Sequence, residues 1–139
     1  MSVADLLAVL FPQFALLHVE LVRLAGGAVR VHARSRAPGA PCPGCGGWSE
    51  RVHSGYERRI CDSAVGDQEL VLQLRVRRFF CDDAECGRRT FAEQVPGLTF
   101  RYGRCTMGLR KVREAVALAL GGRVGAARTP PGRRAGRRR

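Results

Sequence analysis

Alternating apolar and polar positions predict the first regular element of this chain. Two such runs lie within residues 16–34 and flank a Gly-Gly pair at 26–27, a combination typical of a β-hairpin. Because side chains alternate between the two faces of a strand, one set of apolar residues should share a buried face. The residues expected on that face are Leu17, Val19, Leu21, Val29, Val31 and Ala33.

The longest alternating run covers residues 69–80, with leucine or valine at every second position through most of its length. This pattern predicts a long strand that ends at Cys81. We also expect a second hairpin over residues 49–60, because the small residues Ser54 and Gly55 are typical of a turn.

The period of the pattern changes from two to that of a helix after residue 105. Apolar residues then recur every three or four positions, which predicts a helix over 106–120 that ends at the glycine pair 121–122. Residues 3–11 are typical of a short helix or an apolar lead-in. Residues 123–139 contain seven arginines, two prolines and no acidic residue, so we expect a disordered basic tail. We therefore divide the chain into a domain at 1–122 and a tail at 123–139.

Four of the six cysteines stand at spacings typical of zinc knuckles. Cys42 and Cys45 lie in the turn sequence CPGCG, and Cys81 and Cys86 lie in CDDAECG. No signal peptide or membrane span is evident, so we expect a cytoplasmic protein, in which cysteines are more often metal ligands than disulfides. The sequence therefore predicts one structural Zn²⁺ within a zinc region at 42–91. Four thiolates leave no open position for a substrate.

The remaining cysteines and the histidines carry weaker signals. Cys61 and Cys105 have no partner at knuckle spacing and are more typical of small buried apolar residues. His53 could reach a metal but is more typical of a polar strand position, and His18 and His32 are expected to be solvated. We find no catalytic triad, no set of acidic residues typical of a two-metal nuclease, and no complete phosphate-binding loop.

The charge of the chain favours a polyanionic partner. Lys and Arg number 24 against 12 Asp and Glu, giving a net charge of +12, and every basic residue except Lys111 is an arginine. Arginine makes bidentate contacts to phosphate, although a GC-rich codon bias would produce the same excess. We expect the arginines near the zinc region to form a nucleic-acid-binding face: Arg51, Arg58, Arg59, Arg75, Arg77, Arg78, Arg88 and Arg89.

Aromatic residues are interleaved with these arginines, and their role is open between contact with nucleic acid and packing around the zinc. They are Trp48, Tyr56, Phe79, Phe80 and Phe91. Composition does not choose between DNA and RNA.

Several longer motifs resemble the N-terminal zinc-finger region of bacterial insertion-sequence transposases of the ISL-three type. They are CPGCGGWSERVHSGYERRICD, LVLQLRVRRFFCDDAECGRRTFAEQVPGL, RYGRCT and ALALGGRVGA, in this order between about Val19 and Ala126. The segments RRFFC and C-x-RRTF-x-EQVPG are the most specific. The resemblance implies the same four zinc ligands, Cys42, Cys45, Cys81 and Cys86, and recognition of the terminal inverted repeats of an element.

Transposases of this type continue into a helix-turn-helix and a DDE-type catalytic domain, whereas this sequence turns into ARTPPGRRAGRRR. We therefore expect a truncated or frameshifted copy: a small zinc-ribbon-like α+β domain that binds double-stranded DNA in the nucleoid and is not an enzyme. No membrane partner or small-molecule substrate is expected. The alternatives are an interaction module that pairs with full-length transposase or with itself, an inert remnant, and an RNA-binding zinc ribbon.

Overall fold

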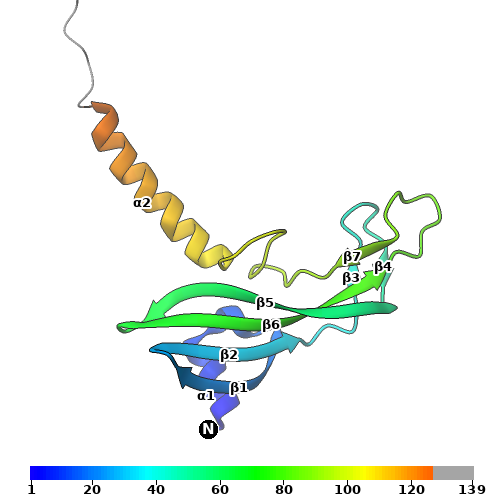
Figure 1. Cartoon of the computed structure of the whole chain (residues 1–139), viewed down its shortest axis with the longest axis horizontal. Helices are drawn as coiled ribbons and strands as arrows, with labels where there is room; N and C mark the ends of the chain where they lie inside the picture. The colour runs from blue at the N-terminus through cyan, green and yellow to red at the C-terminus, as the bar shows by residue number, and fades with distance from the viewer. Residues whose placement is uncertain (127–139) are drawn as a thin grey trace, which may run out of the picture.

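The main β-sheet has the strand order β1-β2-β6-β5, and a short strand, β7, pairs with the end of β6 (Figure 1). The computed structural model describes the backbone of residues 1–126 and the side chains of residues 1–121. A separate two-stranded sheet joins β3 to β4. The elements are α1 (Val3–Leu10), η1 (Pro12–Phe14), β1 (Leu17–Ala25), β2 (Ala28–Ser35), β3 (Ala40–Pro41), β4 (Trp48–Ser49), β5 (Val52–Val65), β6 (Gln68–Phe80), β7 (Thr90–Ala92) and α2 (Met107–Ala126).

The β1–β2 hairpin confirms the hairpin predicted for residues 16–34, except for the face of β1 on which Leu21 lies. Gly26 and Gly27 form the turn at φ angles of 61° and 74°, which glycine adopts without steric cost. A bulge between Val19 and Leu21 shifts the register of β1 by one residue. The expectation that Leu21 lies on the buried face is therefore wrong, because one extra residue moves every later side chain to the opposite face. Leu21 is 50% exposed.

The predicted turn near Ser54 and Gly55 is also wrong. Strand β5 runs through both residues and pairs antiparallel with β6 along almost its whole length. A bulge before Ser54 absorbs the irregularity, and the chain turns at 66–67, where Gly66 has a φ of 62°. The small residues at 54–55 therefore mark a register shift within a strand.

Strand β6 is the centre of the fold and confirms the predicted long strand. On one side it pairs with β5, and on the other it pairs in parallel with β2, so that Ala28 lies opposite Glu69. Periodicity gave no indication of this parallel pairing. The alternating residues Leu70, Leu72 and Leu74 are buried and form the middle of the main core.

Two short segments cover the core face of the sheet. Phe14, from η1, and the half-buried Phe11 pack against it from one end of the chain. Val95 and Leu98, in the segment that follows β7, pack against the same cluster. The predicted short helix near the N-terminus is confirmed as α1, whose first turn is closed by reciprocal hydrogen bonds between Ser2 and Asp5.

Helix α2 projects away from the sheet (Figure 1). Its first turn is capped by the Thr106 hydroxyl, which accepts a hydrogen bond from the Leu109 N–H at 3.2 Å and donates one to buried Asp62 at 2.8 Å. The predicted stop at 121–122 is wrong, because the helix continues to Ala126. Two glycines lower helix propensity but do not end a helix without a turn-forming backbone angle.

The tail predicted at 123–139 is helical in its first four residues, and residues 127–139 lie outside the described part of the chain. The domain division at residue 122 stays a prediction. None of the described helices is long and apolar enough to cross a membrane.

Candidate zinc centre and the surrounding arginines

The first cysteine pair occupies the tip of the β3–β4 hairpin. The Cys42 N–H donates to the Gly47 carbonyl at 2.9 Å, and the Gly46 N–H donates to the Cys42 carbonyl at 2.8 Å. Gly46 closes this turn at a φ of 76°, a backbone conformation that favours glycine. The Gly44 N–H also donates to the Cys42 sulfur at 3.4 Å. The turn thus places both sulfurs on one side and supplies backbone donors to one of them.

The second cysteine pair lies in the loop that joins β6 to β7. The Cys81 N–H donates to the Arg89 carbonyl at 2.9 Å, and the Cys86 N–H donates to the Asp83 carbonyl at 3.1 Å. The Asp83 carboxylate accepts the Glu85 N–H at 2.9 Å and tightens the same turn. The loop therefore returns Cys86 to the side of Cys81.

The four sulfur atoms lie within 4.8 Å of one another. The sulfurs of Cys42 and Cys86 are 3.8 Å apart, and those of Cys45 and Cys81 are 3.6 Å apart. In a tetrahedral zinc site with Zn–S bonds of about 2.3 Å, neighbouring sulfurs are about 3.8 Å apart. The residues present therefore fit one structural Zn²⁺, and the predicted cofactor is confirmed. All four positions would be thiolates, so the site is closed to substrate.

The thiols differ in how readily they ionise without metal. Burial of Cys42 disfavours its thiolate, but backbone N–H groups of Cys45 and Gly44, together with the thiols of Cys81 and Cys45, outweigh this and lower its pKa to about 7. At Cys81, the Asp83 N–H favours the thiolate, but burial and the neighbouring sulfurs raise the pKa to about 12. Binding of Zn²⁺ replaces these protons and removes the mutual repulsion of the sulfurs.

A small apolar cluster packs against the cysteines of the zinc site. Ala40, Cys42, Phe79 and Phe91 are buried together, and the rings of Phe79 and Phe91 lie 5.9 Å apart across the β6–β7 pair. These two aromatic residues therefore pack around the zinc region. Trp48 and Tyr56 are 53% and 41% exposed and do not belong to this cluster.

The other cysteines and histidines lie outside the four-cysteine group. Cys61 and Cys105 are half-buried and face each other across an isolated bridge between β5 and the segment before α2. His53 is exposed and contacts the Phe80 ring, as a polar strand residue. The expectation that His32 is solvated is wrong, because its Nε2 atom is buried on the central strand β2 without a described partner.

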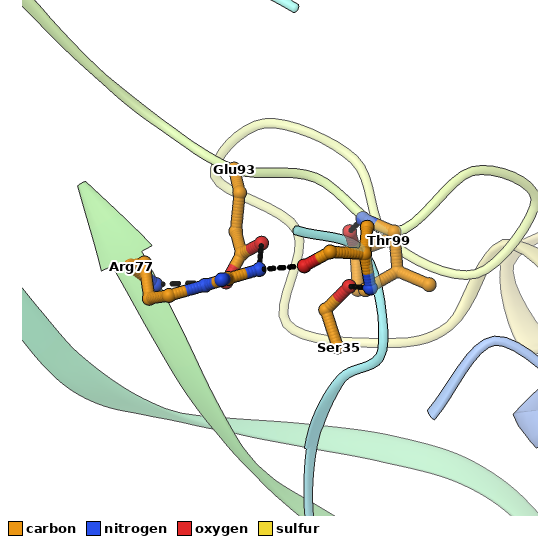
Figure 2. A network of polar contacts seen from close by, with 6 residues as sticks. Ser35, Arg77, Glu93 and Thr99 are labelled. Carbon is orange, nitrogen blue, oxygen red and sulfur yellow. Dashed lines mark hydrogen bonds and ion pairs between the residues drawn. The ribbon is translucent and has the colours of Figure 1, made fainter. Parts of the chain in front are cut away.

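Two of the eight predicted arginines are held by carboxylates. Arg77 forms a buried pair with Glu93, which is 4% exposed, through bonds of 3.0 Å and 2.8 Å to its two oxygens. The Arg77 guanidinium also donates to the Ala37 carbonyl at 2.6 Å, so it joins β6 to the loop after Ser35 (Figure 2). Arg51 lies 3.1 Å from Asp82 and over the Phe80 ring.

Four of the predicted arginines line one cavity, which we name the arginine groove. It has a volume of about 680 Å³ and lies between the first knuckle, strands β5 to β7 and the segment 94–104. It also contains two arginines, Arg101 and Arg104, that the sequence patterns did not single out, because they belong to an irregular segment with no periodicity. The arginines of the groove are Arg58, Arg59, Arg78, Arg88, Arg101 and Arg104.

The remaining two predicted arginines do not line the groove. Arg75 is exposed and lies opposite Arg34 and Glu57 in the register, so it shares the face of the sheet that points away from the core. Arg89 is exposed at the second knuckle. The eight arginines therefore do not form a single face, and their contact with nucleic acid stays a prediction.

Two cysteine knuckles on short β-hairpins that surround one metal site define a zinc-ribbon protein. Residues 38–86 match the family model described as the zinc-finger of transposase IS204/IS1001/IS1096/IS1165. The resemblance to the zinc-finger region of ISL-three-type transposases is therefore confirmed for residues 38–86. The chain matches none of the curated proteins and none of the solved structures with which it was compared.

Proposed function

We propose that this chain is a zinc-dependent DNA-binding domain of a transposase that recognises the terminal repeats of its insertion sequence. The observation that carries the proposal is a groove rich in arginine beside a closed zinc site, in a chain whose zinc region matches a transposase zinc finger. Arginine supplies the charge and the paired donors that phosphate groups require. A bacterial cytoplasm, next to the nucleoid, is the compartment that fits this role.

The metal acts by holding structure. A structural Zn²⁺ joins the β3–β4 hairpin to the β6–β7 hairpin, and the arginines of these segments are positioned by that connection. In the described residues, the four cysteines are the group that could hold a metal, and no cluster of acidic residues accompanies them. We therefore propose that this domain binds DNA and leaves strand cleavage to other parts of a transposition system.

The test combines metal analysis with DNA binding by the full chain. Zinc content is measured after purification, and affinity is measured by fluorescence anisotropy for the terminal repeat, a scrambled duplex and a structured RNA at physiological salt. We expect one zinc per chain and preference for the repeat. A protein without zinc, or one that ignores duplex DNA, would contradict the proposal, and preference for RNA would favour an RNA-binding ribbon instead.

A second candidate function is favoured by helix α2. Among the described apolar side chains of this helix, Val112 is 54% and Val116 51% exposed, whereas Leu109 is half-buried. Exposed apolar stripes of this kind are typical of surfaces that bind another protein. The helix would then pair with a second copy of the chain or with full-length transposase. Sedimentation at increasing protein concentration separates the two candidates, because an interaction module would associate without affinity for DNA.

A further inference from the structure

The arginine groove carries a positive charge that no carboxylate offsets. No aspartate or glutamate lines the groove. In the described part of the chain there are four ion pairs, and none of them involves a groove arginine. By contrast, Arg51 and Arg77, which lie outside the groove, are both paired. Concave surfaces lined by one sign of charge concentrate the opposite charge, so the groove is suited to an anion.

The floor of the groove is fixed by hydrogen bonds to neutral groups. The half-buried Arg58 guanidinium donates to the Gln94 side chain at 3.2 Å and to the carbonyls of Phe100 and Gly103 at 3.1 Å and 2.6 Å. Arg78 donates to the Thr90 hydroxyl at 3.0 Å. These bonds hold both side chains in place and leave their positive charges uncompensated.

The zinc site fixes a third arginine. A Cβ atom added at Gly44 would lie 3.1 Å from the Arg88 side chain and 3.2 Å from the Cys86 sulfur. Arg88 thus packs against the backbone of the first knuckle, although it lies just after the second knuckle in the sequence. A side chain at position 44 would require these neighbours to move by a few tenths of an ångström, and the position of Arg88 depends on both knuckles meeting.

The rim of the groove contains a strained, exposed aromatic residue. Tyr102 has a φ of 59°, which is rare for a residue other than glycine, and is 84% exposed. The Arg101 guanidinium lies over its ring at 4.8 Å and donates to its hydroxyl at 2.9 Å. Backbone strain of this kind persists where the surroundings impose it, and it concentrates at ligand sites. Tyr102 and Arg101 are both exposed and both line the groove.

We propose that the arginine groove binds the phosphate backbone of double-stranded DNA, with Arg58, Arg78 and Arg88 as a fixed floor and Arg101 and Arg104 as an exposed rim. This inference rests on the proposed DNA-binding function and assigns it to one surface. A duplex fits better than a single strand, because its two strands carry one charge per about 1.7 Å of axis, twice the density of one strand. Arg75, on the opposite face of the sheet, lies outside this surface.

The test compares two double variants of the full chain that remove the same charge. R101Q/R104Q removes the rim, whose side chains make no described ion pair, and R23Q/R30Q removes two arginines of the β1–β2 hairpin that neither line the groove nor belong to the predicted nucleic-acid-binding set. Affinity for a terminal-repeat duplex is measured from 50 to 300 mM NaCl. We expect R101Q/R104Q to bind about tenfold or more weakly and to reduce the slope of log K against log salt by about 2. The control should keep most of the affinity.

Zinc content and melting temperature are measured for both variants, and R101K/R104K is expected to restore most of the salt slope because it restores the charge. Equal losses in the two double variants would overturn the assignment to the groove while leaving DNA binding itself intact. If the unmodified chain bound no duplex at any salt concentration, the proposed function would fail, and this inference with it. Groove-dependent binding that prefers RNA or single strands would overturn the choice of duplex DNA.

Discussion

Replacing Arg77 by methionine should strongly destabilise the domain. The substitution R77M keeps much of the side-chain volume but removes the guanidinium that pairs with Glu93, which is 4% exposed. The Glu93 carboxylate then retains only the backbone N–H of residue 77, at 2.9 Å, as its described donor. Loss of one partner of a buried pair costs about 3–5 kcal/mol, because the other charge stays buried without compensation. This is a large part of the 5–15 kcal/mol by which a typical domain is stable.

The assay is urea unfolding at pH 7 with zinc present, and the free energy of unfolding is compared at equal m-values. A matched control is R110M, which removes an i,i+4 pair whose side chains are 54% and 58% exposed and should cost about 0.3–0.5 kcal/mol. The double variant R77M/E93Q should recover much of the loss, because the unpaired charge is gone. If R77M cost no more than R110M, or if E93Q added fully to it, the structural role of the pair would be refuted.

Three further predictions concern the zinc site, one glycine and the start of α2. Removal of zinc by a chelator should unfold the cysteine-bearing hairpins, since structural zinc contributes on the order of 10 kcal/mol to the stability of the fold. Circular dichroism with and without added Zn²⁺ measures the change. An unchanged spectrum would contradict a structural role for the metal. G39A should lower the melting temperature, because a Cβ at Gly39 would overlap the Ser49 carbonyl oxygen and lie 2.8 Å from the Glu50 side chain. The control G87A should be neutral, because a Cβ at Gly87 would meet nothing within 4 Å. Equal melting temperatures for the two variants would refute this argument. T106V should lower the free energy of unfolding by about 1–3 kcal/mol, because buried Asp62 loses a hydrogen bond and α2 loses its cap. T106S keeps the hydroxyl and should be as stable as the unmodified protein. Calorimetry measures both variants, and equal losses of stability would contradict the argument.

The zinc site was predictable because its signal is local. Two cysteine pairs in short glycine- or acid-containing turns specify their own geometry, whatever the rest of the chain does. The strand at 69–80 was predictable for a similar reason, since alternation over many residues is a strong signal of a half-buried strand. The helix after residue 105 was correct in type but not in its end.

The errors arise where local patterns compete with pairing between strands. The bulge in β1 exposes Leu21, and the one in β5 replaces a turn at 54–55; both depend on the register of a neighbouring strand, which periodicity does not specify. The arginine groove was only partly predictable. Arg58 and Arg78 belong to predicted strands, but Arg101 reaches the groove through an irregular segment whose path is determined by tertiary contacts. The ion pair between Arg77 and Glu93 was not predicted for the same reason, because the two residues are far apart in the sequence.

The parallel pairing of β2 with β6 has a consequence for the order of folding. The β1–β2 and β5–β6 hairpins each join strands that follow one another in the chain and should form early. Their docking is less local, because it places Ala28 opposite Glu69, with the first knuckle and β5 between them in the sequence. Such non-local contacts require the closure of a long loop, and proteins that depend on them fold slowly. Zinc ties a point shortly after β2 to the end of β6, so it shortens the loop that must close. Refolding in the presence of zinc should therefore be faster, because the metal acts on the rate of sheet assembly as well as on the stability of the finished domain.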